Sequence, residues 1–308
     1  MIGYKIGQIK VDSKQIRVLI TLDIDINNCK TNLNRKDIKD KEYAKYRCDK
    51  AKVISIEDNE GNKYSNAFSP FYDKIIEYKV GEKVEEPVYN KDIDVVCGEG
   101  IHFFINKEIA LLYGLDRVEN GEYKKWYDNG QLFVQKQYVE GKEQGEYKRW
   151  NDDGQLIVLS HYVDGKYHGE YKQWYENGQL EIQTQYIEGK YHGEYKSWHR
   201  GANNSVEDRG QLHIQTHYIE GKENGEYKQW WSNGQIRVQI HYVDDKRQGE
   251  YKRWFWNGQI EVHSHYNIEG EYHGEYKQWD IEGQLESQFH YINNKIHSKY
   301  KEFDIEAV

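Results

Sequence analysis

The stretch Gly-Glu-Tyr-Lys-Lys-Trp-Tyr-Asp-Asn-Gly-Gln-Leu-Phe-Val-Gln-Lys-Gln-Tyr, at residues 121–138, recurs in modified form along most of this chain. Most successive copies start 24 residues apart, as positions 121, 145 and 169 do. A fixed period of this size indicates an array in which each unit packs only against its neighbours. We therefore expect a repeat fold with a long surface suited to binding. The Gly-Glu-Tyr triplets begin at Gly121, Gly145, Gly169, Gly193, Gly225, Gly249 and Gly274.

Each unit has the pattern of a β-hairpin. Residues 122–127 are rich in aromatic side chains, and Asp128-Asn129-Gly130 supplies residues that tolerate the positive φ of a tight turn. After the turn, Leu132, Val134 and Tyr138 share one parity while glutamines occupy the other, which is typical of a half-buried strand. One hairpin is marginally stable alone, so we expect stacking of neighbouring hairpins to stabilise the array.

We predict a mainly β protein with two domains. Residues 116–308 form a single-layer antiparallel β-hairpin array of seven repeats and a half-repeat C-terminal cap, in which Phe303 takes the place of the Trp. Residues 1–115 form a separate α+β domain. Its expected helix runs from Asn106, a suitable N-cap, to Tyr113, and residues 27–41 form a polar loop. Its expected strands are residues 15–23, 51–57, 75–80 and 101–105.

Charge and composition exclude several classes of protein. The net charge is −9, and it belongs to the repeats because the first 115 residues carry equal numbers of basic and acidic side chains. An acidic array opposes nucleic-acid binding and simple adhesion to anionic lipid. No apolar run has the length of a membrane span, and the N-terminus lacks a signal-type apolar core. The three cysteines show no disulfide or zinc spacing, so we expect an intracellular location.

A tryptophan stands five residues after each repeat glycine. Large aromatic side chains supply the apolar contact that a thin sheet needs, so packing is the favoured role. The alternative is an exposed stacking platform for a partner. The candidate residues are Trp126, Trp150, Trp174, Trp198, Trp230, Trp254 and Trp279.

Histidines recur at a second fixed position, where two units have Gln137 and Gln185 instead. Equivalent positions lie two strands apart, roughly 10 Å, which is too far for neighbouring units to share one metal ion. We expect a polar row that contributes to binding, with no metal or other cofactor; pH-sensitive binding is a subsidiary hypothesis. The candidates are His161, His217, His241 and His265, with His290 at the same position in the last unit.

Cys97 and His102 form the one candidate catalytic pair. A nucleophilic cysteine needs a nearby histidine and an orienting group, and proximity in sequence supplies neither. His102 lies in an apolar strand, where a hydrogen-bonded structural role is the default, and a free cysteine is commonly a small buried apolar residue. We therefore predict that the protein is not an enzyme.

Two further features leave alternatives open. Residues 199–212 replace a short turn with a longer insertion that contains Gly201, Asn203, Asn204 and Asp208; this loop either carries specificity or is a neutral insertion. The Glu of each Gly-Glu-Tyr-Lys lies on the same side of its strand as the Lys two residues later. Such rows keep a sheet soluble, which we favour, or attract a basic partner.

The repeated Gly-x-Tyr-x-x-Trp-Tyr, Asn-Gly-Gln-Leu and Tyr-x-x-Gly-Lys motifs resemble the MORN repeat in its variant form over residues 119–303. The resemblance implies an extended, rolled sheet of hairpins that acts as a scaffold or assembly factor, with lipid binding in some members and antitoxin activity in some bacterial ones. Residues 40–114, through 46–53 and 97–104 with Lys107, Glu108 and Tyr113, resemble a domain that giant DNA viruses attach to repeat arrays. This second resemblance implies a mimivirus-like origin and no activity.

We therefore expect a non-catalytic scaffold that binds a protein partner through its repeat surface. Peripheral membrane association through lipid head groups is the first alternative, and antitoxin-like neutralisation of a partner is another. An enzyme built on Cys97 and His102 is the least favoured. We expect no nucleic-acid partner and consider self-association through exposed strand edges. The expected location is the host cytoplasm or the virion.

Overall fold

The computed structural model of the chain describes residues 1–69, 75–115, 118–201 and 210–302. It is nearly all β, which confirms the predicted fold class: a β domain comes first and a long antiparallel sheet of hairpins follows. Two compact units are present. One comprises Met1–Gly141 with Arg149–Gly154, and the other Lys142–Lys148 with Gln155–Val308. The first repeat hairpin thus belongs to the same unit as the N-terminal residues.

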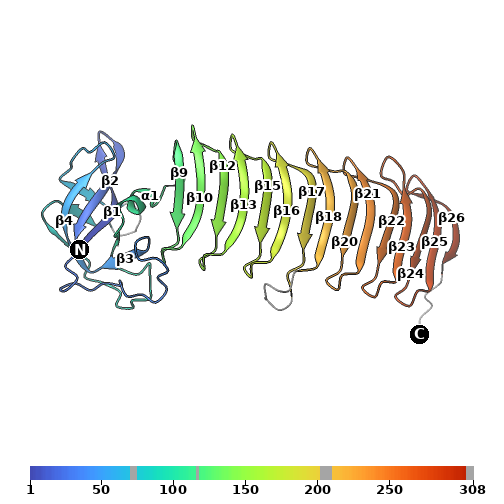
Figure 1. Cartoon of the computed structure of the whole chain (residues 1–308), viewed down its shortest axis with the longest axis horizontal. Coiled ribbons are helices and arrows are strands. Elements are labelled where there is room, and N and C mark those ends of the chain that lie inside the picture. Colours follow the sequence, from blue (N-terminus) through green and yellow to red (C-terminus); the bar gives the residue numbers. More distant parts are fainter. Residues whose placement is uncertain (70–74, 116–117, 202–209, 303–308) are drawn as a thin grey trace. The chain divides into compact units, whose positions relative to one another are not determined.

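The N-terminal sheet has the strand order β3-β8-β1-β2-β4-β7, with β5 pairing with β1 and β6. Figure 1 labels four of its strands, β1 to β4. The β1–β2 hairpin is its longest ladder and turns at Asp12 and Ser13, both with positive φ. A single helix, α1 (Lys107–Leu112), lies among the described residues. The strands are β1 (Ile2–Val11), β2 (Lys14–Asp23), β3 (Lys45–Cys48), β4 (Lys50–Glu57), β5 (Asn66–Phe68), β6 (Glu77–Lys79), β7 (Lys83–Glu85) and β8 (Ile101–Phe104).

The core of this domain follows the alternation of its strands. Val18, Ile20 and Leu22 project to one face of β2 and are fully buried. Glycine at position 7 is required by close packing, because a Cβ there would lie 2.6 Å from the Ile20 Cδ1. Burial of such side chains is the main stabilising contribution to this domain.

Buried charge explains why the strand β3, at one edge of this sheet, was not predicted. All four residues of β3 are buried, including Lys45 and Arg47. The Arg47 guanidinium donates hydrogen bonds to the main-chain oxygens of Val95 at 2.9 Å, of Asn90 at 2.5 Å and of Asp92. A buried cation is tolerated only when its donors are satisfied in this way. In sequence, the same two charges make the segment look exposed.

The predicted helix is present with its predicted cap. The Asn106 side chain accepts hydrogen bonds from the main-chain N–H groups of Glu108, at 2.9 Å, and Ile109, at 3.4 Å. Ile109 and Ala110 pack with Ile6 of β1 in a second apolar cluster. The predicted strands at 15–23, 51–57 and 101–105 are confirmed as β2, β4 and β8, and that at 75–80 is the shorter β6.

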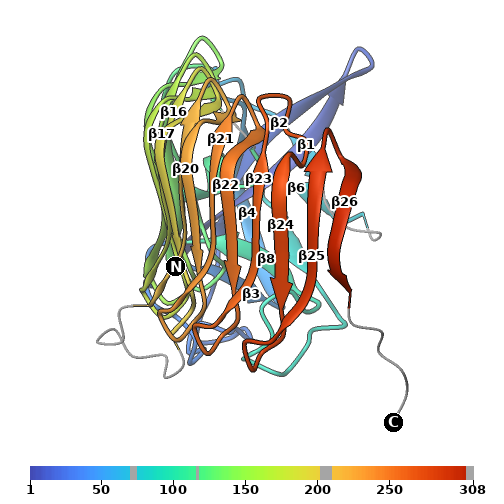
Figure 2. The same ribbon diagram turned by 90° about the vertical axis from the view of Figure 1, so that its right-hand side faces the viewer.

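In the repeats, every unit forms an antiparallel hairpin, as predicted. Within the second compact unit the paired strands follow chain order, and Figure 2 shows β24, β25 and β26 side by side. The strands are β9 (Gly121–Trp126), β10 (Leu132–Val139), β11 (Lys142–Glu143), β12 (Gly145–Trp150), β13 (Leu156–Val163), β14 (Lys166–Tyr167), β15 (Gly169–Trp174), β16 (Leu180–Ile187), β17 (Lys190–Trp198), β18 (Leu212–Ile219), β19 (Lys222–Glu223), β20 (Gly225–Trp230), β21 (Ile236–Val243), β22 (Lys246–Trp254), β23 (Ile260–Tyr266), β24 (Gly274–Trp279), β25 (Leu285–Ile292) and β26 (Lys295–Glu302).

The Asn-Gly-Gln signal builds the turn inside each hairpin. In the third unit the Tyr175 N–H donates to Gln179 O at 2.9 Å, and the Gly178 N–H donates to Tyr175 O at 2.9 Å. The Asn177 side chain accepts from the Gln179 N–H at 3.1 Å, and Gly178 has a φ of 82°. Asparagine and glycine are therefore required here by hydrogen bonding and by backbone conformation respectively.

A β-bulge beside each turn changes which residues share a face. In the sixth unit Arg253 pairs with Val262, whereas Trp254 pairs with Ile260, so Glu261 is the extra residue. Directly opposite residues project to the same face of a sheet. The apolar residue after the turn therefore joins the tryptophan, and it does not share the face of the valine and tyrosine that follow it. The simple alternation expected for the strand after the turn is wrong at this one position.

Tyrosines form the packed face of the repeats. In the second compact unit, Tyr251 and Tyr266 are buried with Ile240 and Val262. The rings of the two tyrosines meet edge to face, with centroids 6.0 Å apart. Tyr167 stacks on Tyr186 with centroids 5.0 Å apart. Edge-to-face and offset contacts of this kind add to the energy of area burial. Aromatic side chains thus supply much of the buried apolar contact in the polar repeats.

Two sequence features lie partly or wholly outside the described residues. The insertion after Trp198 includes residues 202–209, which the structure does not describe. At the C-terminal end, β26 pairs with β25 as the predicted half-repeat requires. Phe303, the proposed counterpart of the tryptophans, lies outside the described residues.

Candidate binding face of the repeat sheet

Three rows of side chains share the face of the sheet opposite the tyrosines. Across the β22–β23 pair, Glu250 faces His265, Lys252 faces His263, and Trp254 faces Ile260. The same register and the same bulge recur in the β15–β16, β17–β18, β20–β21 and β24–β25 pairs. We call this surface, made of the repeated Glu, Lys, Gln or His, and Trp positions, the polar face.

The carboxylates of the polar face are held by two neighbours. Each repeat Glu pairs with the Lys two residues later, as Glu226 does with Lys228 at 2.7 Å. In four hairpins a glutamine of the paired strand also donates to that Glu, as Gln239 does at 2.7 Å. The hydrogen bond from Lys228, followed by that from Gln239, lowers the pKa of Glu226. Each of these seven carboxylates is therefore paired with a cation of its own strand.

The four predicted histidines, His161, His217, His241 and His265, are all exposed. His217, His241 and His265 each lie directly opposite the repeat Glu of the paired strand, and Gln137 and Gln185 take the same place in their own hairpins. The row therefore offers ring nitrogens to solvent beside ionised carboxylates.

The seven tryptophans are all half-buried. Six of them, all except Trp150, lie beside the bulged turn on the polar face, opposite the first leucine or isoleucine of the next strand. In the first compact unit Trp126 stacks on Tyr43, with ring centroids 5.1 Å apart and planes 15° apart. Half-burial gives each ring both an apolar contact within its hairpin and an edge that a partner can reach.

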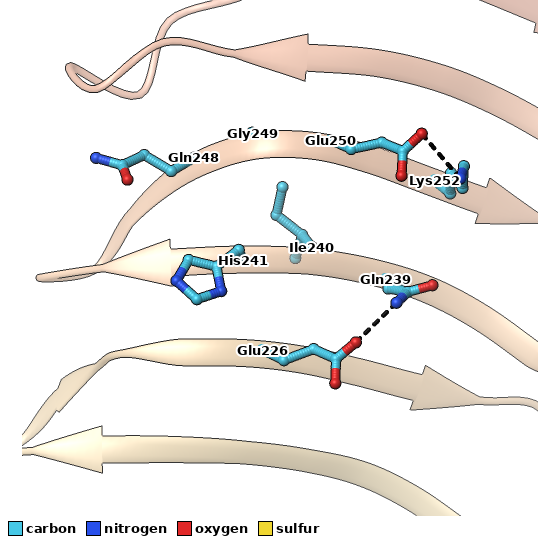
Figure 3. Close-up of a pocket in the computed structure, with 8 residues that line it drawn as sticks. All are labelled: Glu226, Gln239, Ile240, His241, Gln248, Gly249, Glu250 and Lys252. Atoms are coloured by element: carbon cyan, nitrogen blue, oxygen red, sulfur yellow. Dashed lines mark hydrogen bonds and ion pairs between the residues drawn. The ribbon is translucent and has the colours of Figure 1, made fainter.

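A shallow hollow of about 360 Å³ opens on the polar face between β20, β21 and β22. Figure 3 shows Glu226 bonded to Gln239, with His241 on the same strand as that glutamine and Gln248 and Glu250 on the next strand. Glu250 is in turn paired with Lys252 at 2.8 Å. Six of the eight lining residues have polar or charged side chains, so the hollow offers hydrogen-bonding groups to a partner.

Cys97 and His102 line the same hollow of about 430 Å³, and each also contacts other groups. The Cys97 thiol lies 3.4 Å from a carboxylate oxygen of Asp128 and 3.7 Å from the Lys45 Nζ. The ring of His102 is buried, and its Nε2 lies 3.2 Å from Val96 O. Burial, assisted by Lys45 and Lys5, lowers the pKa of His102 to about 3. A histidine so weakly basic is poorly suited to accept the thiol proton near neutral pH.

Sequence reasoning did not single out two groups that the structure brings into these sites. Asp128 was assigned to a turn, and it reaches Cys97 only because the first hairpin packs against the loop before β3. His263 holds a position where most units have glutamine, and its partner Glu250 lies on the neighbouring strand. The break in the glutamine pattern was the available signal for His263.

Comparison with known families divides the chain in the same places as the repeats do. Residues 1–110 match a family of unknown function, DUF5758. Five segments match the MORN repeat variant, at residues 119–140, 143–164, 167–188, 223–244 and 272–293. No curated protein matches the chain. The described residues include no helix of the length and apolarity needed to cross a membrane.

The similarity to MORN repeats supports a binding or scaffold role, a role that in some cases is linked to membranes. Two of the seven hairpins fall outside the matched segments. One of them contains the insertion after Trp198, and the other follows Asp244-Asp245, which replaces the usual acidic residue and glycine of the turn between units. Both nevertheless have the common register, with Trp198 opposite Leu212 and Trp254 opposite Ile260.

Proposed function

We propose that this protein is a non-catalytic scaffold whose polar face binds a protein partner. The observation that carries the proposal is the register shared by the hairpins, which places the same Glu, Lys, Gln or His, and Trp side chains on one face unit after unit. A surface repeated in this way suits a partner that makes many weak contacts, since avidity multiplies modest affinities. Residues 1–115 and 116–308 form its two proposed domains.

The partner in this proposal is a protein and not a nucleic acid. The net charge of −9 belongs to the repeats, and the Lys of each Gly-Glu-Tyr-Lys is already paired with the Glu two residues before it. A polyanion would therefore meet no free row of cations in the described repeats. A protein surface can instead supply donors and acceptors to the glutamine and histidine rows and apolar contact to the half-buried tryptophans.

The experiment is capture of partners by the full chain and by a triple variant, His217→Ala, His241→Ala and His265→Ala. These side chains are exposed, so we expect the variant to keep its fold, as circular dichroism would check. A matched control is Lys190→Ala, Lys222→Ala and Lys246→Ala, three exposed residues at the turns between units. The similarity of residues 40–114 to a domain of giant-virus repeat proteins makes infected host cells the preferred source. We expect the histidine variant, and not the control, to lose the captured protein.

Equal capture by the two variants and the native chain would overturn the polar face as the binding surface. Vesicles containing anionic lipid test the membrane alternative, because co-sedimentation of the full chain would assign the surface to lipid head groups. Light scattering of the purified chain tests self-association. Rescue of cell growth in co-expression with the captured protein would identify an antitoxin-like role.

A further inference from the structure

One hairpin departs from the others in the middle of its polar face. At the position opposite the repeat Lys, five units have glutamine and one has leucine, whereas the sixth unit has His263. That unit also has the row histidine, His265, two residues later. It is the one unit in the sequence with histidines at both positions.

The strand geometry brings both rings to one carboxylate. His263 and His265 project to the same face of β23, because the residue between them, Ser264, is fully buried on the opposite face. Glu250 of β22 faces His265 directly and lies diagonally from His263. The Nε2 of His263 lies 2.8 Å from the Oε1 of Glu250, and the two imidazole centroids are 5.3 Å apart.

These three groups are close enough to share one ion. One nitrogen from each ring and one carboxylate oxygen all lie within 4.8 Å of one another. Ligands of a tetrahedral zinc ion, with bonds of about 2.0–2.2 Å, are about 3.3 Å apart. Side-chain rotations that move the ligand atoms by up to about 1.5 Å close that difference, and two of the three side chains are exposed and can rotate.

We propose that Glu250, His263 and His265 bind a divalent late-transition-metal ion such as Zn²⁺. Two imidazoles and a carboxylate are ligands that this class of ion prefers, and solvent completes the coordination. The row histidines of neighbouring units remain too far apart to share an ion; this site lies within one hairpin. It adds a ligand to the polar face and is independent of any protein partner.

Two lysines set the affinity of this site. His263 lies opposite Lys252 of β22 and Lys277 of β24, and these lysines pair with Glu250 and Glu275, each at 2.8 Å. The ion must therefore compete with Lys252 for the Glu250 carboxylate.

The repeats supply matched variants for the test. His263→Gln gives the sixth unit the residue that five other units have, so it removes a ligand at a position known to accept glutamine. The reverse change, in the fifth unit, is Gln239→His. In that unit Glu226 faces His241 as Glu250 faces His265. The three cysteines are the same in every variant, so zinc binding to thiols cancels in the comparison.

Zn²⁺ is titrated into the full chain and each variant by isothermal calorimetry at pH 7.5 in a non-chelating buffer. We expect His263→Gln to lose one equivalent of zinc, or to bind it at least 10-fold more weakly. We expect the Gln239→His variant to bind one more equivalent of zinc than the native chain. Identical stoichiometry and affinity for the native chain and His263→Gln would overturn the proposal. Melting curves without zinc confirm that both variants are folded.

Discussion

Ile240 faces Tyr227 across the β20–β21 pair and is 2 % exposed, in a place where three neighbouring hairpins have a buried hydroxyl. The equivalent residues are Thr184, Thr216 and Ser264, which face Tyr171, Tyr195 and Tyr251. Among the described atoms, the hydroxyl oxygens of these three residues have no hydrogen-bond partner. The aromatic face therefore accepts a β-branched hydrocarbon at this position and is less stable with a hydroxyl group.

Thr184→Val should stabilise the protein. Valine keeps the branched shape of threonine and removes a polar atom from a site that is 2 % exposed. We expect the free energy of unfolding to rise by about 1 kcal/mol. Urea denaturation followed by tryptophan fluorescence measures the change. Ile240→Thr is the reverse control and should destabilise the chain. A loss of stability in Thr184→Val would show that the hydroxyl makes a hydrogen bond that matters.

Gly130→Ala should destabilise the chain more than Gly178→Ala. Both glycines occupy the same place in the Asn-Gly-Gln turn, with φ values of 89° and 82°. Either alanine meets the left-handed backbone penalty of about 1–2 kcal/mol. At Gly178 nothing lies within 4 Å of the added Cβ, whereas at Gly130 the Asp40 main-chain oxygen lies in its place. A backbone atom cannot move aside as a side-chain end can.

The comparison of these two alanine variants isolates the contact of the first turn with the loop before β3. Lys39 and Asp40 donate main-chain hydrogen bonds to Asn129 O at 2.9 and 3.3 Å, and Gly130→Ala would displace them. We therefore also expect faster proteolysis of residues 36–44 in Gly130→Ala. If the two variants unfold at the same urea concentration and are cleaved alike, this close approach does not contribute to stability.

The hairpins were predictable because turn and strand carry consistent local signals. Asn177-Gly178-Gln179 encodes its own turn through a side-chain hydrogen bond and a positive φ. The bulge beside that turn was not predictable in the same way. The sequence separates Trp174 from Leu180 by five residues, and that number does not say which strand takes the extra residue. The assignment of leucine to a face therefore required the structure.

The N-terminal domain was less predictable because its burial contradicts its composition. The strand β1 contains Gly3 and Gly7, which weaken its β pattern, and each is required by the close approach of a side chain. The strand β3 contains a buried lysine and a buried arginine. The Lys45 Nζ donates to the hydroxyl of Tyr113, and the Arg47 guanidinium donates to main-chain oxygens such as that of Val95, so both have partners in distant segments. Pairing of this kind between distant segments has no local signal in the sequence.

His102→Gln should flatten the dependence of stability on pH between about 6.5 and 5. Burial lowers the pKa of folded His102 to about 3, whereas in the unfolded chain it is about 6.5. Between these values the unfolded chain binds a proton that the folded chain does not, so stability falls as pH falls below about 6.5. The slope contributed by one such group approaches about 1.4 kcal/mol per pH unit.

The measurement is urea denaturation of the native chain and of His102→Gln at pH 7, 6 and 5. Carboxylates with lowered pKa values, such as Glu226, contribute mainly below pH 4.5, outside this window. Lys5, whose pKa burial lowers to about 8, contributes above it. Parallel pH profiles for the two proteins would contradict the assignment of this slope to His102.

Tyr43 and Trp126 should show a coupling energy in a double-mutant cycle. Their rings stack with centroids 5.1 Å apart and planes 15° apart, and Trp126 packs against the cluster that includes Ile109 of α1. Stacked aromatic pairs contribute about 0.5–1.5 kcal/mol beyond their area burial. Urea denaturation of Tyr43→Ala, Trp126→Ala and the double variant gives the coupling.

The control cycle pairs Tyr43→Ala with Trp174→Ala. Trp174 belongs to the other compact unit, so this cycle should give a coupling energy near zero. Equal coupling in both cycles would mean that the effect is not a ring contact. A coupling confined to Trp126 would show that the first hairpin is stabilised by the N-terminal residues as well as by its own repeat contacts.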